Sequence, residues 1–294
     1  MLPKEALTKE EKELLGSTTI QLSKAFMKNI IDTRSSFEEF LQQAVANSHA
    51  VLGSVDLRGQ DLNGLRCDFV SLGLAQFDGA NLSQAQFNYV DLTNASFRGA
   101  KLDGASFRFV RGGAVNWNNV QAEDAQWDRS SLVESNFAAA DLQRSRFVYS
   151  GLEKASFDDA DLMLGSFTWS NLDYATFRNT NLDQTETIGA SLTGADFSSA
   201  RNFAYCREIV MEILARDLDQ DLATMKWLGA VTLLRKWCYP VWAKLLKKDD
   251  PNYFIKAMEI FQKYPTSGCL EAFLGNKYLY NQTGGQIVQK ENAK

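Results

Sequence analysis

The chain has 294 residues, a length that can hold two domains, with a formal net charge of −5 at pH 7 and 45% hydrophobic residues. We expect no membrane span, because Arg235, Lys236 and Lys244 interrupt the most apolar neighbourhood, residues 227–246. Residues 1–34 carry charges throughout, which predicts no signal peptide. The acidic balance disfavours nucleic acid as a partner, because like charges repel.

Residues 1–50 predict two or three short helices. Thr8 and Ser36 each stand three residues before a glutamate, as in the capping box that begins a helix. One apolar face follows within residues 20–31 and another within residues 37–45. Helix 36–47 runs almost directly into the next segment, so we expect residues 1–50 to form an N-terminal helical cap. A separate signalling role is the alternative.

Between residues 51 and 202, every fifth residue is apolar or a near substitute, over 30 consecutive centres without an insertion. A small or β-branched residue stands two places before each centre, as Ala80 stands before Leu82. A helix repeats every 3.6 residues and a strand every 2.0, so a period of five fits neither. A short period held this long predicts a solenoid, in which each unit contacts only its neighbours.

The unit reads small residue, polar residue, then Leu or Phe. Its clearest copies are Ala80-Asn81-Leu82, Ala140-Asp141-Leu142 and Ala160-Asp161-Leu162, with the Phe-centred forms Ala95-Ser96-Phe97, Ala105-Ser106-Phe107 and Ala155-Ser156-Phe157. The segment resembles the pentapeptide-repeat family, whose unit is A-(D/N)-L-x-x. The resemblance covers about half of the chain and implies a β-solenoid, a right-handed quadrilateral β-helix with four units per coil. Residues 51–202 would then make about 7.5 coils and a rod of roughly 36 Å.

Four units make 20 residues, so residues 20 apart should stack and each face should have its own character. Sorting the centres gives a first face from Leu52 and a third from Leu62, both mostly Leu. The second face, from Leu57, and the fourth, from Cys67, are mostly Phe. Two successive coils carry the predicted core centres Leu92, Phe97, Leu102, Phe107, Gly112, Trp117, Ala122 and Trp127.

The second of these coils departs from the Leu and Phe rule. Both Phe faces carry Trp there, at Trp117 and Trp127, while both Leu faces shrink to Gly112 and Ala122. Protein interiors are packed near crystal density, so volume added at two walls must be removed at the other two. The compensation predicts that the four residues share one layer.

One outward column has an unusual composition. The residue two places after each fourth-face centre is aromatic in five coils and arginine in one, and we call these six residues the aromatic ladder: Phe69, Tyr89, Phe109, Arg129, Tyr149 and Trp169. Neighbouring rungs would approach stacking distance, with the arginine as a cation–π partner. An exposed strip of this kind predicts an interface. The alternatives are that terminal helices cover it, that it only stiffens the corner, or that it joins two copies of the chain.

From residue 203 the period of five gives way to one near 3.6. Helices are expected at about 204–217, 220–238, 240–248, 251–263 and 267–278, with Pro240, Pro251 and Pro265 between them. Phe203, Tyr205 and the first helix are expected to close the last coil. Residues 203–282 therefore form a candidate C-terminal helical domain, and residues 283–294, which begin Thr283-Gly284-Gly285, a disordered tail.

No arrangement of residues predicts catalysis, a metal site or a cofactor site. The single histidine is His49, and the four cysteines, Cys67, Cys206, Cys238 and Cys269, lack metal-ligand spacing. The acidic residues of the repeats stand at outward positions, where solvated carboxylates are ordinary. We therefore expect a protein that is not an enzyme.

The charge of the repeats bears on one named function. Residues 50–202 hold 19 acidic and 12 basic residues. Resemblance to quinolone-resistance members of the family implies an acidic rod that imitates DNA and occupies the DNA site of gyrase. Arginines interrupt the acidic stripe here, whereas a phosphate track needs sustained charge of one sign.

On the second face the charges alternate between coils, which predicts charge pairs: Arg58, Asp78, Arg98, then Asp158, Arg178.

The sequence thus favours a non-catalytic scaffold that binds another protein through the aromatic ladder, the C-terminal helices or both. The partner is unknown, and a homodimer is an open alternative. A DNA-mimicking inhibitor or protector of gyrase is the second hypothesis. The expected location is the cytoplasm, with a secreted bacterial effector acting in a host cytosol as the alternative.

Overall fold

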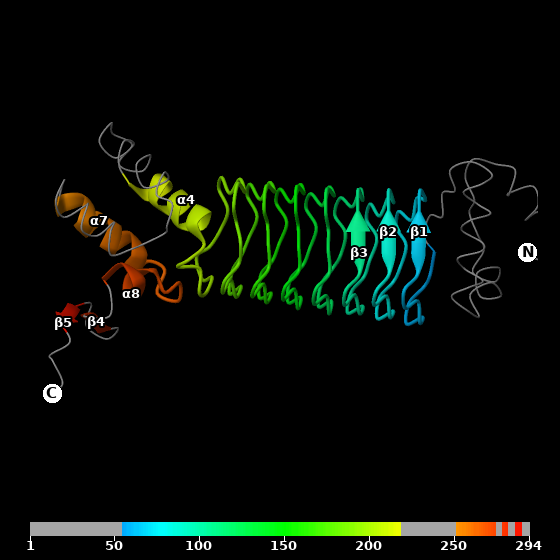
Figure 1. Cartoon of the computed structure of the whole chain (residues 1–294), viewed down its shortest axis with the longest axis horizontal. Helices are drawn as coiled ribbons and strands as arrows, with labels where there is room; N and C mark the ends of the chain where they lie inside the picture. Colours follow the sequence, from blue (N-terminus) through cyan, green and yellow to red (C-terminus); the bar gives the residue numbers. More distant parts are fainter. Residues whose placement is uncertain (1–54, 219–250, 275–277, 282–285, 290–294) are drawn as a thin grey trace, which may run out of the picture.

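The computed structural model describes residues 55–218, 251–274, 278–281 and 286–289. The cap expected at residues 1–50 and the helices expected at 220–238 and 240–248 lie outside these residues. Figure 1 shows a regular stack of coils, followed at its C-terminal end by three helices: α4 (Arg207–Asp217), α7 (Pro251–Gln262) and α8 (Cys269–Leu274).

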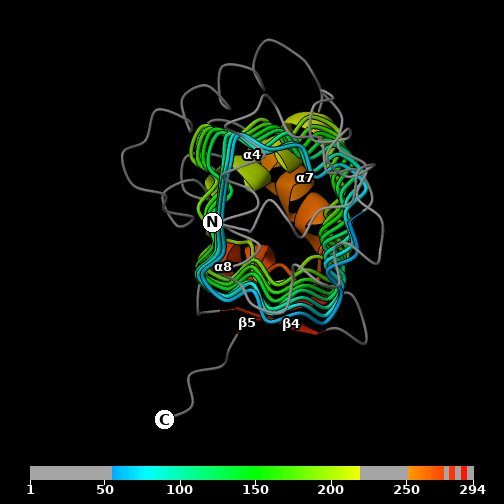
Figure 2. The same cartoon turned by 90° about the vertical axis from the view of Figure 1, so that its right-hand side faces the viewer.

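Residues 20 apart pair in parallel throughout the stack. Strands β1 (Arg66–Asp68), β2 (Gln86–Asn88) and β3 (Ser106–Arg108) form a three-stranded parallel sheet in that register. Elsewhere single parallel bridges continue the register at intervals of five residues, up to the pair Asn181–Arg201. The chain is therefore a β-solenoid with 20 residues per coil, and Figure 2, which looks along it, shows the coils superposed on one outline.

The polar residue of each repeat has a backbone role. In the unit 81–85, the N–H groups of Leu82 and Gln84 donate to the next coil at 2.7 and 2.9 Å, and that of Asn81 to the previous coil at 2.9 Å. The N–H of Ala85 closes the turn onto the carbonyl of Leu82 at 3.0 Å. Only the N–H of Ser83 remains, and the side-chain oxygen of Asn81 accepts it at 3.3 Å. An Asp or Asn at this place thus accepts the one N–H that the backbone hydrogen bonds of the coil leave without an acceptor.

Each unit turns its corner through a residue with positive φ. The corner residues Gly59, Gly79 and Gly99 have φ of 66°, 66° and 65°, and Asn119 and Asn179 have 58° and 57°. The same conformation recurs at every fifth position from residue 59 to residue 194, including positions that carry aromatic or charged side chains. Glycine adopts it without steric cost, whereas other L-residues lose roughly 1–2 kcal/mol. The corners are therefore set by the coil, not by glycine alone.

Aromatic rings fill the two Phe walls of the interior. Along one wall successive rings lie parallel, as Phe137 and Phe157 do at 5.1 Å between centroids and 6° between planes. Across the tube the rings meet edge to face, as Phe137 and Phe147 do at 5.4 Å and 88°. Aromatic rings favour both contacts, the stacked one along a wall and the edge-to-face one across the tube, when their centroids lie about 4.5–7 Å apart. The centres Leu92, Phe97, Leu102 and Phe107 are fully buried.

The coil with the two tryptophans is packed in the same way. The rings of Trp117 and Trp127 lie 5.5 Å apart at 83°, and both side chains are fully buried together with Ala122. A Cβ atom added to Gly112 would lie 3.0 Å from Leu132 Cδ2 and 3.2 Å from a methyl of Val115. Little free volume therefore remains at Gly112. The indole N–H groups of both tryptophans are buried and have no hydrogen-bond partner within the described residues.

The C-terminal segments pack on the last coil. Phe203 is fully buried between Phe197 and Tyr264, with ring centroids 6.0 Å away on each side. The backbone N–H groups on either side of Phe203 donate to the carbonyls of Thr266 and Ser267, both at 3.0 Å. Helix α4 buries Ile209, Val210, Ile213 and Leu214. Tyr205, which was expected to close the coil with Phe203, is instead 69% exposed, because the chain turns outward there before α4 begins.

Two sequence expectations at the C-terminus are corrected. The helix expected at 267–278 ends at Leu274, and the tail expected to be disordered from 283 contains strand β5 (Gln286–Gln289). This strand pairs antiparallel with β4 (Tyr278–Asn281). Both segments are rich in aromatic or β-branched residues, which favour strands over helices. The expected domain boundary between residues 282 and 283 therefore falls inside a strand pair.

Candidate interaction surface

The aromatic ladder lies on the outside of one corner. Its aromatic side chains keep between 36% (Phe109) and 57% (Phe69) of their surface exposed, so the described helices do not cover them. Phe69 stacks on Tyr89 at 5.0 Å and 4°, and Tyr89 stacks on Phe109 at 4.7 Å and 4°. The rings therefore present their edges to solvent, while their faces contact one another.

Arg129 continues the stack where the ring is missing. Its guanidinium carbon lies 5.9 Å from the centroid of Phe109 and 5.4 Å from that of Tyr149, which places it between the two rings. Arg108, on the neighbouring position of the fourth face, also lies 5.9 Å from Phe109. All three distances suit cation–π contacts. The 20-residue register of the sequence predicts the contact of Arg129 with the rings, but nothing in the sequence predicts that of Arg108.

The ladder ends over a glycine. A Cβ atom added to Gly189 would lie 2.4 Å from the ring of Trp169, so this ring leans over the glycine of the following coil. The 20-residue step that relates the ladder residues leads from Trp169 to Gly189. Gly189 thus completes the column by leaving room for the last ring.

The fold does not require aromatic residues at this corner. Every ladder residue has positive φ, between 54° and 59°. Glycine or asparagine would hold this conformation at lower cost than Phe, Tyr or Trp. The equivalent corner of the second face uses glycine and asparagine at five of its positions. The five rings therefore occupy turn positions that do not themselves require an aromatic side chain.

The face that carries the ladder also differs in charge. Within residues 55–204, the fourth face has four arginines, Arg66, Arg108, Arg129 and Arg146, against three acidic residues, Asp68, Asp128 and Glu186. The other three faces together have 16 acidic and 8 basic residues. The ladder therefore lies on the one weakly basic side of an acidic rod.

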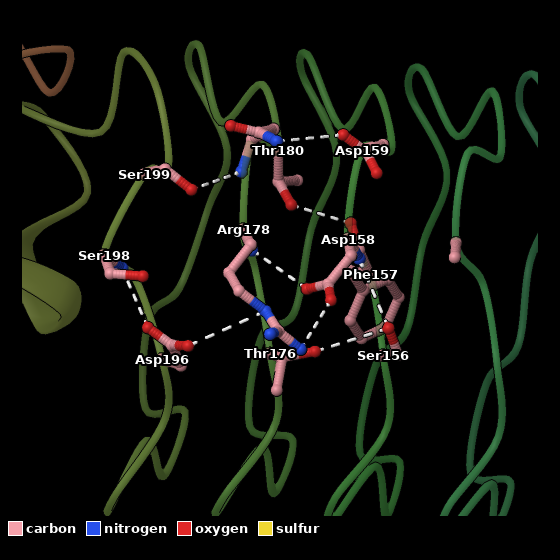
Figure 3. Close-up of polar contacts among 12 residues, drawn as sticks. Ser156, Phe157, Asp158, Asp159, Thr176, Arg178, Thr180, Asp196, Ser198 and Ser199 are labelled. Carbon is pink, nitrogen blue, oxygen red and sulfur yellow. Dashed lines mark hydrogen bonds and ion pairs between the residues drawn. The ribbon is translucent and has the colours of Figure 1, made fainter.

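Charge pairs on the second face follow the predicted pattern only in part. Arg178 bridges neighbouring coils, with contacts to Asp158 at 2.9 Å and Asp196 at 3.8 Å, as Figure 3 shows. Its backbone N–H also donates to Asp158 at 3.0 Å. Arg58 instead pairs with Asp56 of its own strand at 2.7 Å. These exposed pairs each contribute little to stability.

The third face is the most acidic one. It carries seven acidic residues against three basic ones: Asp61, Asp103, Glu123, Asp124, Asp141, Asp161 and Asp183 against Lys101, Arg144 and Arg201. The side chain of Arg144 pairs with Glu123 and Asp124. Burial, together with the charges of Glu123 and Asp141, raises the pKa of Asp103. Repulsion among carboxylates is thus only partly neutralised on this face.

We expect Asp103→Asn to raise the melting temperature slightly at pH 7. A folded-state pKa above the unfolded value means that ionising Asp103 costs stability, and this cost disappears as the pH falls through the carboxyl range. The amide oxygen can still accept the N–H of Glu123, which donates to Asp103 at 3.1 Å. Thermal melts should show the gain at pH 7 and none near pH 3, at about the bottom of the carboxyl range.

Asp91→Asn is the matched control. Burial tends to raise the pKa of Asp91, but hydrogen bonds from Arg111 and Thr93 outweigh it and lower the pKa. This carboxylate therefore stabilises the fold at pH 7 and loses that contribution on acidification, so its substitution should lower the melting temperature. A lower melting temperature for Asp103→Asn at pH 7 would contradict the repulsion.

The rest of the described chain offers no second kind of site. It contains no group of three or more His, Cys, Asp and Glu residues that could hold a metal ion. Cys67, Cys206 and Cys269 are buried, and burial raises the pKa of Cys206 to about 12, which suppresses its reactive thiolate. No helix among the residues described is long and apolar enough to cross a membrane. His49 and Cys238 lie outside those residues.

The comparisons with known proteins agree with the repeat. A family model described as pentapeptide repeats matches eight copies, over residues 75–108 and 170–201. The chain contains pentapeptide repeats. Proteins of this family are generally structural or interaction proteins, not enzymes. No curated protein matches the chain.

Solved structures of pentapeptide-repeat proteins are similar to 55% of this chain. A trypsin-treated form of QnrB1, a plasmid-mediated fluoroquinolone resistance protein, is 16% identical and covers 55% of this chain and 97% of its own, with a TM-score of 0.35. HetL, a protein of heterocyst differentiation regulation in the cyanobacterium Nostoc, is 19% identical and covers 55% and 94%, with a TM-score of 0.23. At these values the likeness concerns the fold alone.

Proposed function

We infer that this pentapeptide-repeat protein is a non-catalytic scaffold that binds another protein through its aromatic ladder. The observation that carries the proposal is a column of half-exposed rings along one corner of the rod, three of which, Phe69, Tyr89 and Phe109, stack on one another. The rings of this column are Phe69, Tyr89, Phe109, Tyr149 and Trp169, with Arg129 among them.

Stacking makes the ladder a favourable docking surface. Tyr89 is held between the parallel rings of Phe69 and Phe109, so its orientation is already fixed before a partner arrives. Ordering side chains on binding costs about 0.5–1.5 kcal/mol for each one, and a preformed stack avoids much of that cost. Aromatic residues and arginine are also the types enriched at the centre of protein interfaces.

The same stacking argues against single-stranded nucleic acid as the ligand. Proteins bind unpaired bases on the faces of aromatic rings. Here the faces of Phe69, Tyr89 and Phe109 contact one another at 4.7–5.0 Å, which leaves no room for a base between them. Ring edges and arginines remain available, and these suit apolar and acidic side chains of a protein.

The finer architecture belongs to the same proposal. We take residues 51–202 as a right-handed quadrilateral β-helix of about 7.5 coils, with residues 1–50 as its N-terminal cap and residues from 203 onward as a C-terminal unit. Support for the C-terminal cap comes from Arg216, which donates to the carbonyl of Ala195 at 3.2 Å, and from the buried face of α4. The proposed location is the cytoplasm, or a host cytosol if the chain is a secreted effector.

The second candidate is a DNA-mimicking inhibitor or protector of gyrase. The acidic third face favours it, because seven carboxylate residues of one face lie along the rod. Lys101, Arg144 and Arg201 interrupt this charge, and a phosphate track has no such interruptions. A supercoiling assay decides the matter: loss of gyrase supercoiling at micromolar protein would support this candidate, and unchanged supercoiling would remove it.

We expect the variant Tyr89→Ser/Tyr149→Ser/Trp169→Ser to lose the partners that the wild-type protein captures from cell extract. The three side chains are 52%, 56% and 56% exposed, so their removal should leave the fold intact. Quantitative mass spectrometry of pull-downs, with thermal melts as a check on folding, measures the effect. The expected loss is tenfold or more for the specific partners, about what removal of one interface hot spot causes.

The matched control is Leu74→Ser/Leu164→Ser/Tyr174→Ser. These side chains are 55%, 46% and 61% exposed and occupy the same turn position on other corners. This control should capture the wild-type set of partners. If the wild type, the ladder variant and the control variant captured the same partners, the ladder would not be the surface that binds them.

A further inference from the structure

The ladder reads almost the same from either end. We propose that its partner is a second copy of this chain, docked antiparallel about a two-fold axis that passes between the rungs of Phe109 and Arg129. This proposal rests on the proposed function, because it names the occupant of the same surface. The axis lies in the contact plane and is perpendicular to the rod. Each outward column of one chain therefore lies against the same column of the second copy, which runs in the opposite direction.

The rungs match in this arrangement. Phe69 meets Trp169 of the second copy, Tyr89 meets Tyr149 of the second copy, and Phe109 meets Arg129 of the second copy. Two of these pairs are aromatic, and the third places the guanidinium of Arg129 at the edge of Phe109, because Tyr89 and Arg129 of its own chain already cover the two faces of that ring. Each match occurs twice because the axis repeats it. All six rungs are engaged, and no charge faces a like charge.

The column beside the ladder on the fourth face is also self-complementary. Under the same axis Arg108 faces Asp128 of the second copy, again twice. No ion pair within the described parts of the chain involves either residue; Arg108 contacts the ring of Phe109, and Asp128 has one buried carboxylate oxygen without a hydrogen-bond partner. Farther out, Asp68 faces Thr168 of the second copy, and Asn88 faces Val148 of the second copy. Opposed charges of this kind fix the register of an interface.

The column on the other side of the ladder permits the contact. Arg111 faces Ser131 of the second copy, and Asp91 faces Gly151 of the second copy. Arg111 and Asp91 already form an ion pair within one chain, so neither needs a partner across the axis. Serine and glycine leave space for the neighbouring rod to approach.

A parallel dimer does not have this complementarity. An axis along the rod brings each rung against itself, so Arg129 meets Arg129 of the second copy. It also brings the fourth-face column against the first-face column, where Arg108 meets Arg111 of the second copy. Like charges in contact disfavour such an interface. The order of the residues therefore selects the antiparallel arrangement.

The size of the strip sets the strength to be expected. Six rungs span about 24 Å at the ~4.8 Å spacing of paired strands. Such a strip, with its flanking columns, lies at the small end of specific protein interfaces. We therefore expect a weak, concentration-dependent dimer and not an obligate one.

Cysteine cross-linking of the full chain tests the pairing. In a Cys238→Ser background, the variants Tyr89→Cys and Tyr149→Cys are purified separately and oxidised with copper phenanthroline, alone and mixed. Because position 89 faces position 149 across the axis, the mixture should give a disulfide-linked dimer on non-reducing gels. Each variant alone should give little, and Asn119→Cys, on another corner, is the control for random collision.

Efficient cross-linking of Tyr89→Cys alone would overturn the antiparallel axis, and so would a mixture that links no better than the control.

A second test exchanges the charges of the two residues that face each other across the axis. Arg108→Asp and Asp128→Arg should each weaken the dimer about tenfold in sedimentation velocity, and the double variant should restore it, because each residue faces the other. If the chain stays monomeric at its highest soluble concentration, the dimer is wrong. The proposed scaffold still stands in that case if the ladder variant loses its captured partners, and falls if it does not.

Discussion

Gly112→Leu should lower the free energy of unfolding by about 1–3 kcal/mol, the usual cost of overpacking a filled core. The reason is the short distance from a Cβ at this position to Leu132 and Val115, 3.0 and 3.2 Å. Gly112 does not lie in the left-handed region, so a side chain brings no backbone strain and the cost is one of volume. Urea denaturation of the full chain measures it.

A second substitution that restores stability tests whether Gly112 and Trp117 fill the same layer of the core. Adding Trp117→Phe to Gly112→Leu should recover much of the loss, because the neighbouring coils already combine Leu and Phe at these walls. The change also removes the buried indole N–H of Trp117 that lacks a partner within the described residues. Gly113→Leu, whose Cβ would meet only Val133 O at 4.0 Å, is the control and should be nearly neutral. Strictly additive losses in the double variant would show that the two walls do not share one layer.

Phe203→Ala should cost about 3–5 kcal/mol, the range for removing a large buried aromatic side chain. Phe203 is fully buried against Phe197 and Tyr264, and the N–H groups beside it hold the segment at Thr266 and Ser267. Its loss should therefore loosen the end of the solenoid. Denaturation gives the free energy, and limited trypsin digestion should show earlier cleavage near α4.

Tyr205→Ala serves as the comparison for Phe203. Its side chain is 69% exposed two residues farther along, so its loss should change stability by less than about 0.5 kcal/mol, as for most surface substitutions. Equal losses for the two variants would contradict the role given to Phe203 in closing the last coil.

The repeat could be predicted from sequence because its constraints are local and periodic. An apolar centre every five residues sets which side chains point inward, and the 20-residue step then sets which residues stack. The contacts of Phe69 with Tyr89 and of Arg129 with Phe109 follow from that step alone. The value of φ at the corners needs no separate prediction, since each unit adopts the same turn.

The C-terminal region was predicted less well because its contacts are non-local and do not repeat. Nothing in the sequence near Tyr205 indicates that it points outward, and the pairing of β4 with β5 depends on two segments that a helical period cannot find. The ion pairs were also only partly predictable. Arg58 can reach Asp56 of its own strand as easily as a neighbouring coil, and a register argument does not choose between them.

The candidate surface combines a periodic part with a chemical part. The position of the ladder follows from the register, but its meaning comes from exposure, from the stacked rings and from the basic character of one face. These three observations are independent of one another. Leu74, Leu164 and Tyr174 are as exposed and also have positive φ, so the stacked rings and the charge of the face are what distinguish the ladder from them.

Hydroxyl-radical footprinting of the ladder tests the central claim most directly. Tyr149, Trp169 and Tyr174 are 56%, 56% and 61% exposed in the isolated chain and should be oxidised at rates that their exposure and ring chemistry set. When the protein is bound to its partner, whether a second copy at high concentration or a captured protein, we expect Tyr149 and Trp169 to be protected while Tyr174 keeps its rate. Unchanged oxidation of both ladder residues in a demonstrated complex would contradict the claim that this corner is where the protein binds.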